Sequence, residues 1–255
     1  MNPLEILEDL SIPEGKRVLV YKDTLIVSDI HLGYESEAEL EGAFLPRVQL
    51  KHALRDIVDV VNSHGIRRLV IAGDLKHKFE ALTWQERVEI EKFVNTVYNY
   101  GVKDVILVRG NHDTFLKGLL ANLNVRMVDD LLELNGNIAV THGHILLDKE
   151  ILSRYKLIIM GHEHPVAAVK MGGATVSRFP VFLLMPLDCC DTRLLVMPAL
   201  GVYQSGNPIS YERSGYLSPI IKKYGKPELS QLYVSDSGMT VEMPEMRYLR
   251  DYLVA

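Results

Sequence analysis

The sequence predicts an α/β protein with two β-sheets. Strand and helix patterns alternate through the first half of the chain, and short apolar segments follow one another through the second half. Two successive strand–helix–strand units require a parallel arrangement with right-handed crossovers. The strand-rich second half then implies a second sheet.

The first half of the chain begins with a predicted hairpin, followed by two helices that alternate with buried strands. Apolar residues at helical spacing predict the first helix, and Pro46 lies where a helix can start. Thr83 and Glu86 form a capping-box pattern at the start of the second helix. The expected elements are a hairpin over 18–29, helices over 47–62 and 84–100, and strands over 68–72 and 104–108.

Beyond Asn122 the helical pattern fades. The stretch 203–226 is rich in Ser, Gly, Pro, Tyr and Lys, which predicts a long surface loop. The alternating glutamates of 35–41 predict a solvated loop as well. We expect one domain over 1–255, with a core over about 15–200 and a C-terminal loop and strands over 201–255. The expected strands are 125–128, 131–134, 137–141, 157–160, 166–169, 181–185 and 194–198.

Composition and charge are those of an ordinary globular chain of 255 residues. Apolar residues make up 47% and charged residues 24%, which argues against disorder. The apolar runs are too short to span a membrane and the acidic N-terminus does not resemble a signal peptide, so we expect a cytoplasmic protein. A net charge of −5 argues against a surface that holds long duplex DNA.

The two cysteines, Cys189 and Cys190, are adjacent. Neighbouring cysteines very rarely form a disulfide because the ring is strained, so we expect buried thiols in a reducing compartment. A vicinal-thiol metal site is the alternative, but no second cysteine pair exists to complete it.

Seven candidate metal ligands follow apolar, β-branched runs and sit beside glycines or turns. Loops at strand ends would bring them to one edge of a sheet. Carboxylate and amide oxygens mixed with imidazole suit Mn, Fe, Ni or Zn better than Ca or Mg. A carboxylate that bridges two ions about 3.5 to 4 Å apart lets the pair lower the pKa of a shared water and hold a phosphate for in-line attack. The ligands are Asp29, His31, Asp74, Asn111, His142, His162 and His164.

Five short motifs, taken together, resemble those of the calcineurin-like metallophosphoesterases. They are Asp29-x-His31, Gly73-Asp74, Gly110-Asn111-His112-Asp113, His142-Gly143 and Gly161-His162-x-His164. The resemblance implies a four-layer α-β-β-α sandwich of two mixed β-sheets, with helices on the outer faces and a metal site at the carboxyl ends of the strands. It also implies hydrolysis of phosphodiester or phosphomonoester bonds by direct attack of a metal-bound hydroxide.

The same resemblance assigns roles to individual residues. One ion would be held by Asp29, His31, Asp74 and His164, and the other by Asp74, Asn111, His142 and His162. Asp74 would bridge two divalent transition-metal ions, for which Mn²⁺ is the first expectation and Fe, Ni or Zn are alternatives. His112 would donate a proton to the leaving group or stabilise developing charge, held in place by a carboxylate such as Asp113 or one from elsewhere.

The GDL and GNHD motifs and the late segment RLLVMPALGVYQSGNP resemble small archaeal and bacterial phosphoesterases related to the SbcD-type repair nuclease. Some of these relatives accompany helicases or ligases, and by resemblance alone such an association is a candidate here. The large nuclease carries a capping domain and a coiled-coil-binding extension that this chain is too short to hold. We therefore do not expect double-strand-break processing.

Four further residues are candidates for contact with substrate. Arg109 directly precedes GNHD and could bind a phosphate bidentately or pair with a nearby acid. Arg47 could reach the site from the start of its helix or stay in solvent. His77 and His144 adjoin ligand loops and could act on substrate or hydrogen-bond to the ligands.

The predicted function is metal-dependent hydrolysis of a phosphodiester, and also of monoesters as an open alternative, in a nucleotide or nucleic acid. A nuclease for single-stranded or short substrates in DNA repair would be favoured if Lys222, Lys223, Tyr203, Tyr211 and Tyr216 formed a basic, stacking groove. A catalytically silent scaffold would lack a ligand or His112, and the sequence has all of them. A homodimer, the commonest assembly, stays an open expectation.

Overall fold

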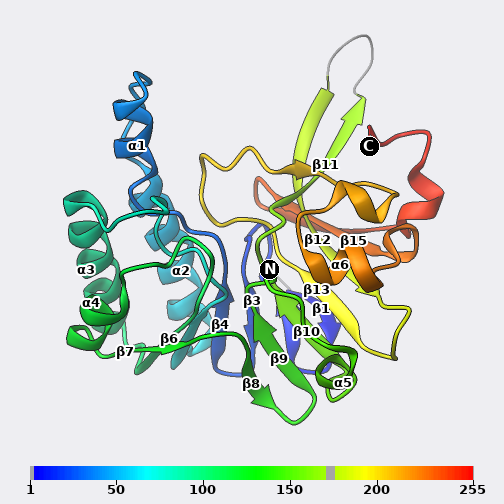
Figure 1. Ribbon diagram of the computed structural model, residues 1–255, viewed down its shortest axis with the longest axis horizontal. Coiled ribbons are helices and arrows are strands. Elements are labelled where there is room, and N and C mark those ends of the chain that lie inside the picture. The colour runs from blue at the N-terminus through cyan, green and yellow to red at the C-terminus, as the bar shows by residue number, and fades with distance from the viewer. Residues whose placement is uncertain (1–2, 171–175, 255) are drawn as a thin grey trace.

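The first of two β-sheets has seven strands in sequence order, seen in the computed structural model of residues 3–170 and 176–254 (Figure 1). Neighbouring strands are antiparallel from β1 to β4 and parallel from β4 to β7, so the sheet is mixed. Its strands are β1 (Leu4–Leu7), β2 (Leu10–Ile12), β3 (Leu19–Tyr21), β4 (Thr24–Val27), β5 (Arg68–Ile71), β6 (Asp104–Val108) and β7 (Val125–Val128).

The second sheet is also mixed, in the order β14-β11-β12-β13-β10-β9-β8, with β15 paired to β12 and β16 to β15. Its centre, β9, β10 and β13, is parallel. The strands are β8 (Leu132–Asn135), β9 (Ile138–Thr141), β10 (Leu157–Met160), β11 (Pro165–Lys170), β12 (Val176–Pro186), β13 (Arg193–Val196), β14 (Asn207–Pro208), β15 (Gln231–Asp236) and β16 (Met239–Met243).

Helices cover the outer faces of both sheets (Figure 1). α2 and α3 pack on the first sheet, and α6 packs on the second. The helices are α1 (Tyr34–Leu40), α2 (Gln49–His64), α3 (Trp84–Asn99), α4 (Lys117–Asn122), α5 (Lys149–Leu152) and α6 (Pro219–Tyr224), with short 3₁₀ turns at Arg213–Gly215, Pro227–Leu229 and Met246–Leu249.

Alternate side chains of each strand enter different cores, as the two-residue strand period requires. In β5, Leu69 and Ile71 pack against the helices, whereas Val70 faces the second sheet. In β10, Ile159 belongs to the core between the sheets and Ile158 to the core under α6. Three apolar cores therefore separate four layers, and the predicted α-β-β-α sandwich is confirmed.

The parallel strands end in register at one edge of each sheet. Val27 of β4 pairs with Ile71 of β5, which pairs with Leu107 of β6. In the second sheet, Met160 of β10 pairs with both Thr141 of β9 and Val196 of β13. Because these strands run in the same direction within each sheet, the loops that follow them emerge together.

The prediction of a solvated loop at residues 35–41 was wrong. Residues 34–40 form α1, and the carboxylate of Glu35 is buried. Its Oε1 accepts the backbone N–H groups of Val48 and Gln49 at 2.9 and 2.8 Å. α2 has no cap of its own and starts at Gln49, two residues after its predicted start, because Glu35 caps it from another helix.

The stretch 203–226 is only partly the surface loop that its composition predicts. It holds the short strand β14, a 3₁₀ turn and α6, whose Ile220 and Ile221 are fully buried against the second sheet.

Cys189 and Cys190 are free and half-buried rather than buried, with Sγ atoms 3.2 Å apart. They lie between β12 and β13, where the chain turns at the surface.

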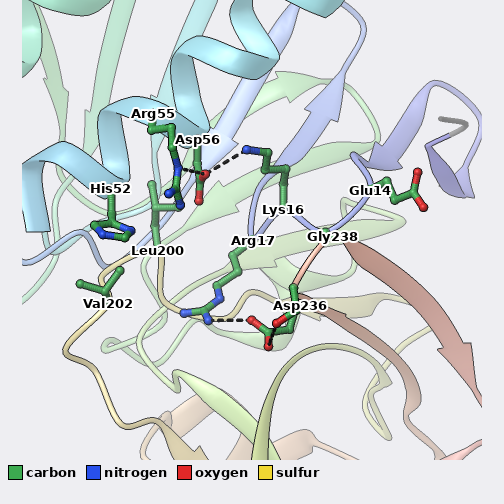
Figure 2. A pocket seen from close by; sticks show the side chains of 12 residues that line it. Glu14, Lys16, Arg17, His52, Arg55, Asp56, Leu200, Val202, Asp236 and Gly238 are labelled. Atoms are coloured by element: carbon green, nitrogen blue, oxygen red, sulfur yellow. Dashed lines mark hydrogen bonds and ion pairs between the residues drawn. The ribbon is translucent and has the colours of Figure 1, made fainter. Parts of the chain in front are cut away.

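A hollow of about 350 Å³ lies between the 14–17 turn, α2 and the β15–β16 hairpin (Figure 2). Lys16 Nζ lies 2.9 Å from Asp56 Oδ1 and 2.8 Å from Asp59 Oδ2, and Arg17 lies 3.1 Å from Asp236. These cations are already paired with carboxylates, and their ion pairs connect α2 and the C-terminal hairpin to the turn between β2 and β3 of the first sheet.

Within the described ranges, no helix combines the length and apolarity needed to cross a membrane.

Candidate metal centre

All seven predicted ligands lie in loops that directly follow parallel strands. These loops belong to both sheets and meet at the edge where the strands end. Asp29 and His31 follow β4, Asp74 follows β5, Asn111 follows β6, His142 follows β9, and His162 and His164 follow β10.

Five of these ligands share an unusual backbone conformation with positive φ. Non-glycine residues rarely adopt it, and each costs on the order of 1 kcal/mol or more, so it persists only where surrounding contacts enforce it. The residues and angles are Asp29 (54°), His31 (50°), Asp74 (53°), His162 (70°) and His164 (46°). Such concentrated strain is typical of a functional site.

The first ligand cluster contains Asp29, His31 and His164. One donor atom of each lies within 4.8 Å of those of the other two. His164 Nε2 is 3.0 Å from Asp29 Oδ1 and 3.4 Å from His31 Nε2. The cluster therefore offers one carboxylate oxygen and two imidazole nitrogens to a common point.

The second cluster contains Asp74, His142 and His162, again with donor atoms within 4.8 Å of one another. Asn111 joins it, because its Oδ1 lies 3.1 Å from His142 Nε2. Asp74 Oδ2 is 3.3 Å from His142 Nε2 and 3.8 Å from His31 Nε2. Asp74 thus lies between the two clusters, which is where a bridging carboxylate is needed.

The clusters fit divalent metal ions. Asp29 and Asp74 are only 0% and 2% exposed, and a buried carboxylate requires a positive partner. The donors are oxygen and imidazole nitrogen without thiolate, the mixture that transition ions such as Mn²⁺, Fe²⁺ or Zn²⁺ accept. Two imidazole nitrogens that face each other, as in His31 and His164, are compatible with a cation that both can coordinate.

Burial and mutual charge shift the pKa values of the cluster in opposite directions. Burial lowers the pKa of His31 to about 3 and that of His162 to about 4. Burial disfavours charge on Asp29 too, but His164 and His142 together outweigh it and lower the carboxyl pKa to about 2. For His142, burial is outweighed by the carboxylates of Asp74 and Asp29 together with the Ala72 carbonyl, which raise the imidazole pKa to about 9. Without an ion the site therefore holds ionised carboxylates, neutral imidazoles at His31 and His162 and a protonated imidazole at His142, which must lose its proton to coordinate a metal.

Glycines next to the ligands let the loops approach each other closely. A Cβ on Gly110 would lie 2.1 Å from Asp74 Oδ1, and a Cβ on Gly161 would lie 2.4 Å from Asp29 Oδ2. A side chain at either position would displace a ligand carboxylate. The glycines of the GNHD and GHEH motifs are thus required by packing around the ligands.

His112 lies beside the clusters and is oriented by two contacts. Its backbone N–H donates to Asp74 Oδ1 at 3.0 Å, and its ring lies 5.0 Å from that of His31. Its Nδ1 is in contact with the carbonyl oxygen of His77. Since a carbonyl can only accept, Nδ1 carries the proton in the neutral ring and Nε2 remains free for chemistry.

The predicted role of Asp113 in holding His112 was wrong. Asp113 Oδ2 accepts the backbone N–H groups of Asp74 and Gly110, both at 2.8 Å, and Oδ1 accepts that of Leu75 at 2.9 Å. Burial, followed by the charge of Asp74, raises the pKa of the Asp113 carboxyl to about 6. Its carboxylate fastens the ligand loops after β5 and β6 to each other, and the carbonyl of His77 takes the orienting role.

His77 and His144 both contact ligands. His77 Nδ1 lies 3.3 Å from His31 Nδ1, so it can accept a hydrogen bond from the N–H at that position. The proton of the neutral His31 ring is then on Nδ1, and Nε2 is available to a metal. The ring of His144 lies 5.2 Å from that of His142, and its buried Nδ1 has no hydrogen-bond partner among the described residues. Burial lowers the pKa of His144 to about 4.

The two candidate arginines are paired with acids. Arg109 lies 3.2 Å from Asp129, and Arg47, with a side chain that is 60% exposed, lies 3.3 Å from Glu39.

The five residues whose basic, stacking groove would favour a nuclease, Lys222, Lys223, Tyr203, Tyr211 and Tyr216, do not share one exposed surface. Tyr216 is 4% exposed, and Arg250 lies over the ring of Tyr211. Tyr203 instead stacks on Tyr34, beside His77.

Two buried side chains that the sequence did not single out support the ligand turns. Glu163, between His162 and His164, is 2% exposed and accepts the N–H of Leu217 at 3.0 Å and that of Ser218. Ser218 Oγ in turn donates to the Gly143 carbonyl at 2.6 Å. The segment before α6 therefore braces the turns after β9 and β10. In the sequence, the position of Glu163 between two predicted histidine ligands was the feature that could have indicated this role.

We expect Glu163→Gln to weaken Mn²⁺ binding about 10- to 100-fold, the usual effect of losing a group that orients ligands. The amide can accept one of the two N–H groups but sets its own NH₂ against the other. Isothermal titration of the metal-free protein with Mn²⁺ would measure this. Glu228→Gln, on a 3₁₀ turn away from the ligands, is the control, and an unchanged affinity in Glu163→Gln would contradict the bracing role.

The sequence matches the calcineurin-like phosphoesterase family profile over residues 23–181, a span that contains all seven ligands. The chain belongs to the calcineurin-like phosphoesterases. Members of the family are hydrolases of phosphoester bonds with divalent metal ions, and the two clusters of this phosphoesterase can bind such ions.

The fold of this phosphoesterase is similar to that of a solved structure. It is similar to the nuclease MPE of Pseudomonas putida, with 21% identity over 94% of this chain and 99% of that chain and a TM-score of 0.64. A phosphoesterase of E. coli, Yfce, is 20% identical over 72% of this chain and 84% of its own, with a TM-score of 0.39. No curated protein sequence gives a significant match.

Proposed function

We propose that this phosphoesterase hydrolyses phosphodiester bonds in nucleic acid or nucleotides with two divalent metal ions, Mn²⁺ being the first expectation. The observation that carries the proposal is the pair of adjacent clusters, Asp29–His31–His164 and Asp74–His142–His162, with His112 beside them. When bound, two such ions lower the pKa of a coordinated water and neutralise phosphate charge. Similarity of fold to the nuclease MPE agrees with a nucleic-acid substrate.

The protein's own residues supply the remaining functions. His77 and Asp74 hold His112 so that its Nε2, in the protonated ring, can donate a proton to the leaving-group oxygen. Lys78 is paired with Glu37 at 2.8 Å and Arg109 with Asp129 at 3.2 Å, so neither is a free cation for a dianionic monoester. This favours diesters, which carry one charge fewer. The predicted homodimer and the association with a helicase or ligase stay predictions.

Metal-free protein reloaded with Mn²⁺ should hydrolyse bis(p-nitrophenyl) phosphate and a labelled single-stranded oligonucleotide faster than p-nitrophenyl phosphate. His112→Ala should lower kcat about 10²- to 10⁴-fold, the contribution typical of a general acid, while binding the same number of ions. His64→Ala is the control, because His64 lies at the end of α2 and its hydrogen bond to Ser63 is exposed at the surface. Wild-type protein with two bound ions and no diesterase activity would refute the proposed function.

A further inference from the structure

A continuous row of five aromatic rings borders the metal clusters. Tyr203 stacks on Tyr34 with centroids 5.5 Å apart and planes at 14°. Tyr34 lies 4.6 Å from His77, which lies 5.7 Å from His112 at an interplanar angle of 14°. Phe79 meets His112 edge-on at 5.8 Å. The two histidines therefore separate two aromatic ends, Phe79 and the Tyr34–Tyr203 pair.

The row is assembled from four separate parts of the chain, and His112 comes from the loop after β6. Tyr34 begins α1, His77 and Phe79 lie in the loop after β5, and Tyr203 follows β13. The backbone under Phe79 is fixed, because its carbonyl accepts from Thr114 Oγ1 while the carbonyl of His77 contacts His112. Tyr203 Oη donates to the Pro46 carbonyl. These contacts fix the backbone at Phe79 and the ring of Tyr203 before any ligand arrives.

The exposed ends of the row are available for contact. Phe79 is 51% exposed, and Tyr203 is partly exposed with one face on Tyr34. Burial of a phenyl ring typically stabilises a protein by about 1.5 to 3 kcal/mol. The exposed part of the Phe79 ring does not contribute this stabilisation to the folded protein. A flat, apolar ligand surface would recover that contact.

Apart from the bound ions, the side chains around this row offer little electrostatic attraction for a polyanion. Lys78 pairs with Glu37, and Arg47 pairs with Glu39. The chain carries a net charge of −5. A nucleic acid bound here must therefore gain much of its affinity from stacking, which every nucleobase can provide.

We propose that Phe79 and Tyr203 form a nucleobase-stacking shelf on either side of His112, so that the substrate is single-stranded nucleic acid with unpaired bases flanking the scissile phosphate. Tyr34 supports Tyr203 in this shelf. Bases in a duplex are already paired and stacked and cannot reach the rings without being extruded. The shelf rests on the proposed diesterase function and specifies its substrate.

The test compares two fluorescent single-stranded oligonucleotides of equal length and charge, oligothymidylate and the same chain with abasic residues. Phe79→Ala and Tyr203→Ala should each raise the KM for oligothymidylate about 5- to 100-fold with kcat nearly unchanged, as expected for loss of one stacked base. The KM for the abasic chain should not move. Phe79→Tyr should retain stacking, and Tyr248→Ala, 65% exposed on the far 3₁₀ turn, is the control.

Binding measured by anisotropy with Mn²⁺-loaded His112→Ala protein separates the shelf from catalysis. Tighter binding of oligothymidylate than of the abasic chain, lost in the double variant with Phe79→Ala, supports the shelf. Equal binding of both chains, or no effect of Phe79→Ala and Tyr203→Ala, overturns it even if bis(p-nitrophenyl) phosphate is hydrolysed. Absence of all diester hydrolysis in wild-type protein with two ions bound would refute the proposed function instead.

Discussion

Asp74→Asn is expected to abolish turnover and to reduce the number of Mn²⁺ ions bound per chain from two to at most one. Asp74 Oδ2 lies 3.3 Å from His142 Nε2 and 3.8 Å from His31 Nε2, so this carboxylate is close to ligand atoms of both clusters. A neutral amide is a weaker ligand for a hard cation. We expect kcat/KM to fall at least about 10³-fold, because a catalytic metal contributes several kcal/mol and each 1.4 kcal/mol is a factor of ten.

Isothermal titration and elemental analysis of the loaded protein would give the number of ions. The matched control is Asp129→Asn, since Asp129 has a side chain that is 78% exposed and pairs with the exposed Arg109. If Asp74→Asn still bound two ions with wild-type affinity, Asp74 would not be the bridge.

Asp113→Ala is expected to cause the largest loss of stability, about 3 to 5 kcal/mol in the free energy of unfolding. The substitution leaves the buried N–H groups of Asp74, Leu75 and Gly110 without their acceptor, and each such group costs about 1 to 3 kcal/mol, not fully additively. Urea unfolding of the metal-free protein measures the change without a contribution from bound ions.

Asp113→Asn separates shape from charge, because an amide oxygen can still accept part of these bonds. It should cost clearly less than Asp113→Ala. Asp104→Ala removes a half-exposed carboxylate that pairs with Arg68 at 2.9 Å and should cost no more than about 1 kcal/mol. A loss below about 1 kcal/mol for Asp113→Ala would show that the ligand loops do not depend on this carboxylate.

The elements whose information is local in sequence were predicted well. The strands 104–108, 125–128 and 157–160 have the predicted bounds, and the capping box of Thr83 and Glu86 is present at α3. The seven candidate ligands converge for the same reason. Each directly follows a buried parallel strand, and parallel strands carry their following loops to one edge.

Residues whose partners are distant in sequence were predicted poorly. Glu35 looked like one of several solvated acids, yet it caps α2. Asp113 looked like a partner of its neighbour His112, yet it binds N–H groups 38 and 39 residues away. Glu163 binds N–H groups 54 and 55 residues away. Nothing in the residue types shows which backbone a carboxylate will meet.

The sequence by itself determined the two sheets, the candidate ligands and their order along the chain, because strand periodicity and ligand chemistry are written in adjacent residues. Only the tertiary structure decided which atoms face each other. The position of Asp74 between the clusters, the carbonyl that orients His112 and the aromatic row from Tyr203 to Phe79 all depend on loops from different strands meeting in space. Such contacts follow from the packing of the two sheets, which no local pattern specifies.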